Sequence, residues 1–213
     1  GKALIAAAKT AKHAVAIGSS FITFEMADIL HQAGVDFTVI MLEAYFWEPV
    51  FDEIGGRIIE KVLMDNGVKI MRRSEIVKVL GNKKVTGVIL KDGTELPCDM
   101  IICGIGLTCP MQWLKNAGLN VNRGILANEY LETNFPDVWT AGDAAEFQDP
   151  ILEEVVQLGS WVNAQEQGKT AGLNMLGQKN QFRFVSFYST HGFGLQISFL
   201  GDVRPLPERK FIS

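Results

Sequence analysis

The chain has 213 residues, of which 47% are hydrophobic and 21% charged, a balance typical of a soluble globular protein that excludes a disordered tail or a collagen-like fibre. Its 20 Lys and Arg against 24 Asp and Glu leave a formal net charge of -4, the wrong sign for a dedicated binder of nucleic acid or of an anionic membrane. No apolar run reaches the ~18 residues of a membrane-spanning helix, and the opening residues lack the apolar core of a signal peptide. We therefore expect a cytoplasmic protein with no nucleic-acid partner and no membrane partner.

The first seventy residues alternate between short apolar runs and helical spacing. Each apolar run is short enough for a buried parallel strand. Gly18 lies between the first expected strand and the helix that follows it, and Gly34 lies at the end of that helix. The pattern predicts strand, helix, strand, helix and strand in turn over 13–17, 21–30, 37–41, 51–66 and 68–71. This is a βαβ arrangement, so we expect an α/β fold with a Rossmann-like parallel sheet.

From residue 75 the hydrophobic period changes to two. Turn residues at 81–84 and at Asp92-Gly93 then predict an antiparallel meander inside the otherwise parallel arrangement. The strands and helices expected from here to the end of the chain are strands at 76–80, 85–90 and 100–103, a helix at 111–117, a strand at 136–139, a helix at 160–176 and strands within 184–199. On the long helix, small and apolar residues such as Ala164, Gly168 and Ala171 are available for one packed face.

Small residues occupy the first strand-to-helix turn. Gly18, Ser19 and Ser20 give phosphate oxygens access to the amides at the helix N-terminus, where the helix dipole favours an anion. The turn departs from the G-x-G-x-x-G pattern, because serines replace the second glycine and Thr23 the third, which should loosen or shift the helix against the sheet. The turn is thus either a dinucleotide pyrophosphate site or an ordinary glycine-started turn.

An acidic side chain after the second strand would bind the ribose hydroxyls of NAD. Glu43 stands two residues beyond the strand end and can reach in, or it is a solvated loop carboxylate. No Arg lies between Gly34 and Asp52 to pair with an additional phosphate, so NAD is favoured over NADP.

The three cysteines, Cys98, Cys103 and Cys109, are an odd number without a C-x-x-C pair, which leaves too few ligands for a disulfide framework or a zinc site. Cys98 and Cys103 have the spacing of a redox dithiol, but they flank a strand and lie on opposite faces of it, so we expect small buried side chains. The histidines are scattered, and no metal site is expected. We also expect residues 45–47 (YFW) to anchor the core and the basic residues from Arg72 to Lys84 to form a solvated face of the meander.

The segment ETNFPDVWTAGDAAEF, residues 132–147, resembles the second flavin motif of the FAD-dependent pyridine nucleotide-disulfide oxidoreductase superfamily. The turn ending in Glu25, the meander with its Lys91-Asp92-Gly93, and Gly104-Ile105-Gly106 resemble further pieces of that family in the same order. The stretch 159–175 is similar to the branch with NADH-dependent ferredoxin, rubredoxin and nitrite reductase components and apoptosis-inducing-factor-like proteins.

This resemblance implies three parts of the chain. Residues 10–117 are expected to be the NAD-binding domain, 118–178 the C-terminal half of the FAD-binding domain, and 179–213 a partial C-terminal interface domain. No G-x-G-x-x-G turn precedes His13, so the half that binds the ADP part of FAD is missing. We therefore expect a fragment of a longer protein or a truncated member of the family.

For the NAD side, the resemblance implies a role for each matching residue. Gly18, Ser19 and Ser20 would contact the pyrophosphate, Glu25 would hold the nicotinamide carboxamide, and Gly106 would pass close to the nicotinamide ribose. Glu43, as argued above, would bind the adenosine ribose.

For the FAD side, the resemblance makes Phe21 the aromatic that covers the flavin face when no nucleotide is bound. Asp143 would accept a ribityl hydroxyl, with Gly142 allowing the close approach, and the helix start near Trp161 would aim its amides at the N1/O2 edge of the flavin.

The implied function is that of an FAD-dependent NADH oxidoreductase, in which hydride passes from NADH to flavin and on to an acceptor such as an electron-carrier protein. The cofactors, FAD and NAD, carry the chemistry, so no side chain is assigned as catalytic. Two alternatives remain: a non-catalytic nucleotide-binding or interaction module, and a subunit of a split flavoenzyme completed by a separate FAD-domain polypeptide.

Overall fold

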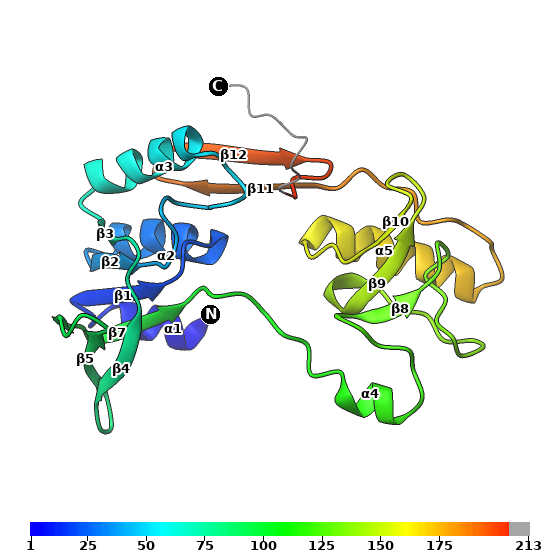
Figure 1. Ribbon diagram of the computed structural model, residues 1–213, viewed down its shortest axis with the longest axis horizontal. Coiled ribbons are helices and arrows are strands. Elements are labelled where there is room, and N and C mark those ends of the chain that lie inside the picture. The colour runs from blue at the N-terminus through cyan, green and yellow to red at the C-terminus, as the bar shows by residue number, and fades with distance from the viewer. Residues whose placement is uncertain (205–213) are drawn as a thin grey trace. The chain divides into compact units, whose positions relative to one another are not determined.

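The computed structural model describes residues 1–204, and the chain divides into two units (Figure 1). The first contains residues 1–106, 190–197 and 204, and the second contains 107–189 and 198–203. The end of the expected interface segment, 205–213, lies outside the described residues.

The first unit is built on a parallel sheet whose strand order is β3-β2-β1-β7. Its strands are β1 (His13–Ile17), β2 (Asp36–Ile40), β3 (Lys69–Met71) and β7 (Met100–Cys103), and its helices are α1 (Lys2–Ala8), α2 (Phe21–Gln32) and α3 (Glu53–Asp65). Ile17 pairs with Ile40 on one side and with Cys103 on the other, so the carboxyl ends of three strands meet at one edge. The turn after β1 and the loop after β2 are therefore neighbours.

The meander forms a separate antiparallel sheet in the same unit. It consists of β4 (Ile76–Gly81), β5 (Val85–Leu90) and β6 (Glu95–Pro97). Val88 and Leu90 of the meander share a buried cluster with Val15 and Ile40 of the parallel sheet. The mixed α/β fold with a parallel sheet and an antiparallel meander is confirmed.

The second unit surrounds a smaller sheet, ordered β10-β9-β8. Its elements are α4 (Gln112–Asn116), β8 (Ile125–Ala127), a 3-10 turn η1 (Gly142–Ala144), β9 (Ala145–Asp149), β10 (Glu154–Val156) and α5 (Trp161–Met175). Its core gathers Leu131, Phe147, Val156, Ala171 and Phe182.

A C-terminal hairpin, β11 (Phe187–Gly192) and β12 (Leu195–Leu200), contributes to both units. Phe193 and Gly194 at its turn both have positive φ, 51° and 78°, which matches the twist of a two-residue hairpin loop. Residues 190–197, here called the hairpin tip, belong to the first unit.

One expectation about secondary structure was wrong, and several elements were not expected. The strand expected at 136–139 is a turn in which Asp137 has φ 59°, and the segment forms only an isolated bridge between Glu132 and Trp139. Helix α1, which buries no residue, and strands β6, β8, β9 and β10 were not anticipated.

The packed face of α5 is also different from the expected one. Its buried residues are Asn163, Gln167, Ala171 and Asn174, so amide side chains replace most of the small apolar residues. Trp161, at the helix start, is 86% exposed. Amides can pack inside because they find hydrogen-bond partners, such as the carbonyl oxygens of Tyr130 and Asn180 for Asn174.

The expectations for the aromatic run and the cysteines were partly right. Phe46 and Trp47 are buried and pack against Phe24, with ring centroids 6.5 and 5.5 Å away, so they anchor the core as expected. Cys98 is buried, but Cys103 is exposed, because the last residue of β7 lies at the open end of the sheet.

Arg72 is not simply part of a solvated face. Its guanidinium donates to Glu60 at 2.7 Å, and Arg57 donates to the same carboxylate at 2.8 Å. Glu60 is fully buried and also accepts from the Phe46 amide at 3.1 Å, which ties α3 to the loop after β2. Burial would raise the pKa of Glu60, but the hydrogen bonds from Arg72 and Arg57 outweigh it and hold that pKa below its usual range.

Candidate functional site

The turn between β1 and α2 requires glycine at residue 18. Gly18 has φ +90°, and a Cβ there would lie 2.7 Å from the carbonyl oxygen of Gly104. Its own amide donates to Ile40 at 2.8 Å, which fixes the turn to the end of β2. The glycine therefore satisfies a close backbone approach and a backbone conformation that other residues rarely adopt.

The start of α2 is capped by a serine and left open to an anion. The hydroxyl of Ser20 accepts from the Thr23 amide at 3.2 Å. Among residues 1–204, no acceptor is found for the amides of Ser19 and Ser20, and the Ser19 hydroxyl oxygen is buried without a partner. Unpaired donors at a helix N-terminus are what a phosphate group needs.

Thr23 fits without the loosening expected from its replacement of glycine. Its side chain is completely buried, and its hydroxyl donates to the carbonyl oxygen of Gly18 at 2.7 Å. A Cβ on Gly104 would collide with the hydroxyls of both Ser20 and Thr23. Gly104, at the end of β7, thus supplies the space that the missing third glycine of the turn would have supplied.

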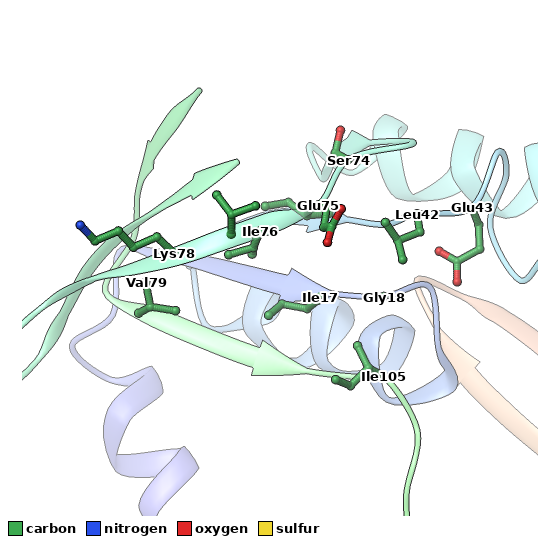
Figure 2. Close-up of a pocket in the computed structure, with 12 residues that line it drawn as sticks. Ile17, Gly18, Leu42, Glu43, Ser74, Glu75, Ile76, Lys78, Val79 and Ile105 are labelled. Atoms are coloured by element: carbon green, nitrogen blue, oxygen red, sulfur yellow. The ribbon is translucent and has the colours of Figure 1, made fainter. Parts of the chain in front are cut away.

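Gly18 and Glu43 line the same pocket, which has a volume of about 390 Å³ (Figure 2). The Glu43 side chain extends from the loop after β2 toward the end of β1, where Gly18 lies. One of its carboxylate oxygens is buried and has no hydrogen-bond partner in the described part of the chain. A buried carboxylate oxygen beside a glycine turn is a suitable acceptor for a ligand hydroxyl.

Much of the remaining pocket wall comes from residues to which the sequence gave no role in the site. Strand β4 and the residues before it supply one wall, and Ile105 supplies another part. The contributing residues of that first wall are Ser74, Glu75, Ile76, Val77, Lys78 and Val79. Alternating hydrophobicity predicted β4 itself, but no local signal shows which strand will border a site on another sheet.

Three other predicted residues of the first unit lie around this turn. Phe21 begins α2, and its ring packs against Trp47 with centroids 4.8 Å apart. Glu25, one turn further along α2, accepts a hydrogen bond from Thr190 at 2.8 Å. Gly106 is exposed, has φ +95°, and is free of neighbours where a Cβ would stand.

The predicted flavin residues of the second unit gather around η1. The buried Gly142 has φ +77°, and its amide donates to the Gln167 side chain at 2.7 Å. The carbonyl oxygen of Asp143 accepts from Gln157 at 2.7 Å, while the Asp143 residue itself is exposed. Two glutamines thus hold the turn that presents this carboxylate, and no local sequence signal marks either of them.

The residues of this second unit fit a polar ligand such as the ribityl chain of FAD. The backbone of Gly159 lies close to the Asp143 carboxylate: a Cβ on Gly159 would be 3.4 Å from one of its oxygens. Because residue 159 is a glycine, no side chain from it blocks the carboxylate. Ser160 caps α5 and accepts from the Asn163 amide at 3.3 Å. The Asn163 side-chain oxygen and the Gln167 side-chain nitrogen are buried without partners, which leaves polar capacity on the same helix face.

Within residues 1–204, no group of three or more His, Cys, Asp or Glu side chains could hold a metal ion. None of the helices in the described part of the chain combines the length and apolar character needed to cross a membrane.

A parallel sheet with a glycine turn, an open helix N-terminus and a strand-end acid defines the class of Rossmann-like dinucleotide-binding folds. The family of pyridine nucleotide-disulphide oxidoreductases matches residues 2–168. The chain belongs to this family, and the resemblance in the sequence is confirmed.

Known proteins of similar sequence and structure are redox enzymes by name. The nitrite reductase [NAD(P)H] of Bacillus subtilis (strain 168) is 28% identical over 98% of this chain and 26% of its own length. The putidaredoxin reductase of Pseudomonas putida is 30% identical over 77% of this chain and 40% of its own. A ferredoxin reductase from Rhodopseudomonas palustris shares the fold, with a TM-score of 0.87 at 23% identity over 92% of this chain and 49% of that one.

The chain spans between a quarter and a half of the length of these proteins. FAD and the nicotinamide dinucleotides are the cofactors of the family, as the sequence motifs indicated.

Proposed function

We propose that this chain carries the NADH-binding domain and the second half of the FAD site of an oxidoreductase that delivers electrons to a carrier protein. In this proposal, residues 10–117 bind NAD, 118–178 complete the flavin site, and 179–213 begin an interface domain. Family membership supports the redox class. The name of the putidaredoxin reductase supports a redox protein as the acceptor.

One observation carries the proposal: a glycine turn and an unpartnered acid share one pocket at the carboxyl edge of the parallel sheet. Gly18 and Glu43 both line it, and the buried Glu43 oxygen has no partner within residues 1–204. An acceptor in that position suits a ribose hydroxyl and repels a ribose phosphate, so NADH is the proposed nucleotide.

The other residues of the first unit have complementary tasks. The amides of Ser19 and Ser20 would receive the pyrophosphate at the helix N-terminus. Glu25 would accept from the nicotinamide carboxamide, and Gly106 would leave room for the adjoining ribose. Phe21 would stand over the flavin until nicotinamide displaces it.

In the second unit, Asp143 would accept a ribityl hydroxyl beside Gly142, and the first turn of α5 at Trp161 would direct its amides at the flavin. When bound, FAD would accept hydride from NADH and release electrons to the acceptor. The protein's contribution is to align the two rings and to place donors where negative charge develops.

Calorimetric titration of the chain with NADH and NADPH tests the nucleotide assignment. We expect NADH to bind more tightly than NADPH. Glu43→Gln should reduce this difference in affinity, because it removes the charge that repels the 2'-phosphate of NADPH and keeps an oxygen that accepts a hydrogen bond. Glu53→Gln, on the exposed start of α3, is the matched control. If neither nucleotide binds at about 1 mM, the nucleotide assignment is wrong.

Absorbance spectra test the flavin assignment. Flavin absorbance that stays with the chain after unbound FAD is removed by gel filtration, either as purified or after incubation with FAD, supports a flavin site on this chain. Nucleotide binding without any flavin binding would favour the non-catalytic module, and co-purification of a polypeptide bearing a G-x-G-x-x-G turn would favour the split flavoenzyme.

A further inference from the structure

The hairpin tip contacts α2 at successive turns of the helix. Thr190 donates to Glu25 at 2.8 Å, and the Phe193 amide donates to Asp28 at 3.0 Å. The Phe193 ring lies 6.1 Å from the Phe24 ring. The two hydrogen bonds each join residues 165 positions apart in the sequence, so the tip is placed by the fold and not by local structure.

The contact is too close to allow the tip much freedom. A Cβ on Gly192 would lie 2.8 Å from the Phe24 ring, so only glycine permits this approach. Thr190 itself is 2% exposed. Its β-branched side chain has few rotamers, and a buried strand position restricts them further. The hydroxyl therefore meets Glu25 in a defined direction.

The two carboxylates on this side of α2 differ in what remains free. Asp28 uses both oxygens, one for the Phe193 amide and one for the Gln32 side chain at 2.9 Å. Glu25 uses one oxygen for Thr190, and its second oxygen accepts no hydrogen bond from any residue of the described chain. An ionised carboxylate accepts through both oxygens, so Glu25 retains capacity for an amide donor of a ligand.

We propose that Thr190 is a positioning residue for nicotinamide binding: its hydroxyl holds one Glu25 oxygen so that the other accepts from the carboxamide NH₂. This inference rests on the proposed function, in which Glu25 meets the nicotinamide. It assigns to the hairpin tip a part in nucleotide recognition, although the tip lies outside the nucleotide-binding sequence motif.

Binding of two ligands tests the inference on the 213-residue chain. NADH contains the carboxamide, whereas ADP-ribose contains the same pyrophosphate and adenosine without the nicotinamide. We expect Thr190→Val, which keeps the shape but removes the donor, to weaken NADH about tenfold and to leave ADP-ribose within about twofold of the parent chain. Thr190→Ser, which keeps the hydroxyl, should bind NADH nearly as the parent does.

Equal weakening of both ligands by Thr190→Val would show a general structural role, and no weakening of NADH would show no role; either result overturns the inference. A double-mutant cycle gives a second measurement. In a Glu25→Ala chain, Thr190→Val should have no further effect on NADH affinity, because the group it positions is gone. Independent, multiplying effects would also overturn the inference.

The same measurements separate this inference from the proposed function. A parent chain that binds neither ADP-ribose nor NADH refutes the nucleotide site and the inference with it. A parent chain that binds both, together with a Thr190→Val chain that binds NADH equally well, refutes only the role of Thr190.

Discussion

Each unit of the chain contains, at its candidate site, a turn with a glycine of positive φ. The two turns differ in how closely the glycine is packed and in whether the backbone amides of the turn have acceptors. Gly18 is pressed against the backbone of Gly104, and the amides that follow it at Ser19 and Ser20 have no acceptor in residues 1–204. Gly142 would place an added Cβ at ordinary contact distance, 3.5 Å from Ala164, and its amide is already bonded to Gln167. The first turn offers backbone donors to an anion, and the second offers the carboxylate of Asp143 to a hydroxyl.

Alanine at each glycine gives the largest expected difference. Gly18→Ala should lower the free energy of unfolding by about 3 kcal/mol for two reasons. Alanine is strained at this positive φ, and its Cβ would collide with the carbonyl oxygen of Gly104. Gly142→Ala, where the nearest side-chain atom is 3.5 Å from the added Cβ, should lose about 1 kcal/mol. Urea unfolding measures both, and equal losses would contradict the contrast between the two turns.

The loop that carries Glu43 near the first turn depends on the buried Glu60. We expect Glu60→Gln to lose about 2 kcal/mol at pH 7, because Arg57 and Arg72 lose their charged partner. The folded-state pKa of Glu60 is lowered, so its contribution is complete above the unfolded pKa of ~4.3 and disappears as pH falls through the folded value.

Urea midpoints between pH 7 and pH 3 measure this dependence. The parent chain and Glu60→Gln should converge in acid, whereas Glu53→Gln, which removes an exposed partner of Arg57, should follow the parent throughout. A constant difference between the parent and Glu60→Gln at every pH would contradict the ionic role.

The second turn should depend on Gln167 more than on Gln157. Gln167→Leu leaves the buried Gly142 amide without an acceptor, at a cost of about 1.5 kcal/mol in unfolding free energy. Gln157→Leu breaks a hydrogen bond at an exposed position, so its effect should stay below about 0.5 kcal/mol. Thermal or urea unfolding of the two variants checks the order, and a reversed order would show that Gln167 does not anchor the turn.

The smallest expected effect belongs to Thr23 in the first turn. Thr23→Val removes the hydroxyl that donates to Gly18 and should lose about 1 kcal/mol of stability. Thr10→Val, at an exposed hydroxyl, is its control and should change stability by less than about 0.5 kcal/mol. No loss in the Thr23 variant would mean that the Gly18 carbonyl finds another donor.

The sequence was sufficient where local pattern determines structure. The alternation of strand and helix from His13 to Met71 was predicted almost to the residue, because buried parallel strands and amphipathic helices have different periods. The position of Glu43 near Gly18 was predicted from its distance along the chain, since the ends of adjacent parallel strands meet.

Local pattern failed where a partner distant in sequence decides the structure. The amide-lined face of α5 depends on partners such as Gly142, which stands 25 residues before Gln167. The hydrogen bond between Thr190 and Glu25 and the space that Gly104 leaves for Thr23 have no counterpart in any window of neighbouring residues. A strand was expected at 136–139, but the left-handed backbone of Asp137 turns the chain instead.

The hairpin tip of the first unit is separated by more than eighty residues from the stretch 1–106 that forms the rest of its core. A truncated chain that ends at residue 106 would therefore lack the packing of Gly192 against Phe24 and the hydrogen bond from the Phe193 amide to Asp28. To express the first unit alone, for crystallisation or as a biosensor, residues 1–106 should be joined through a linker to the hairpin tip.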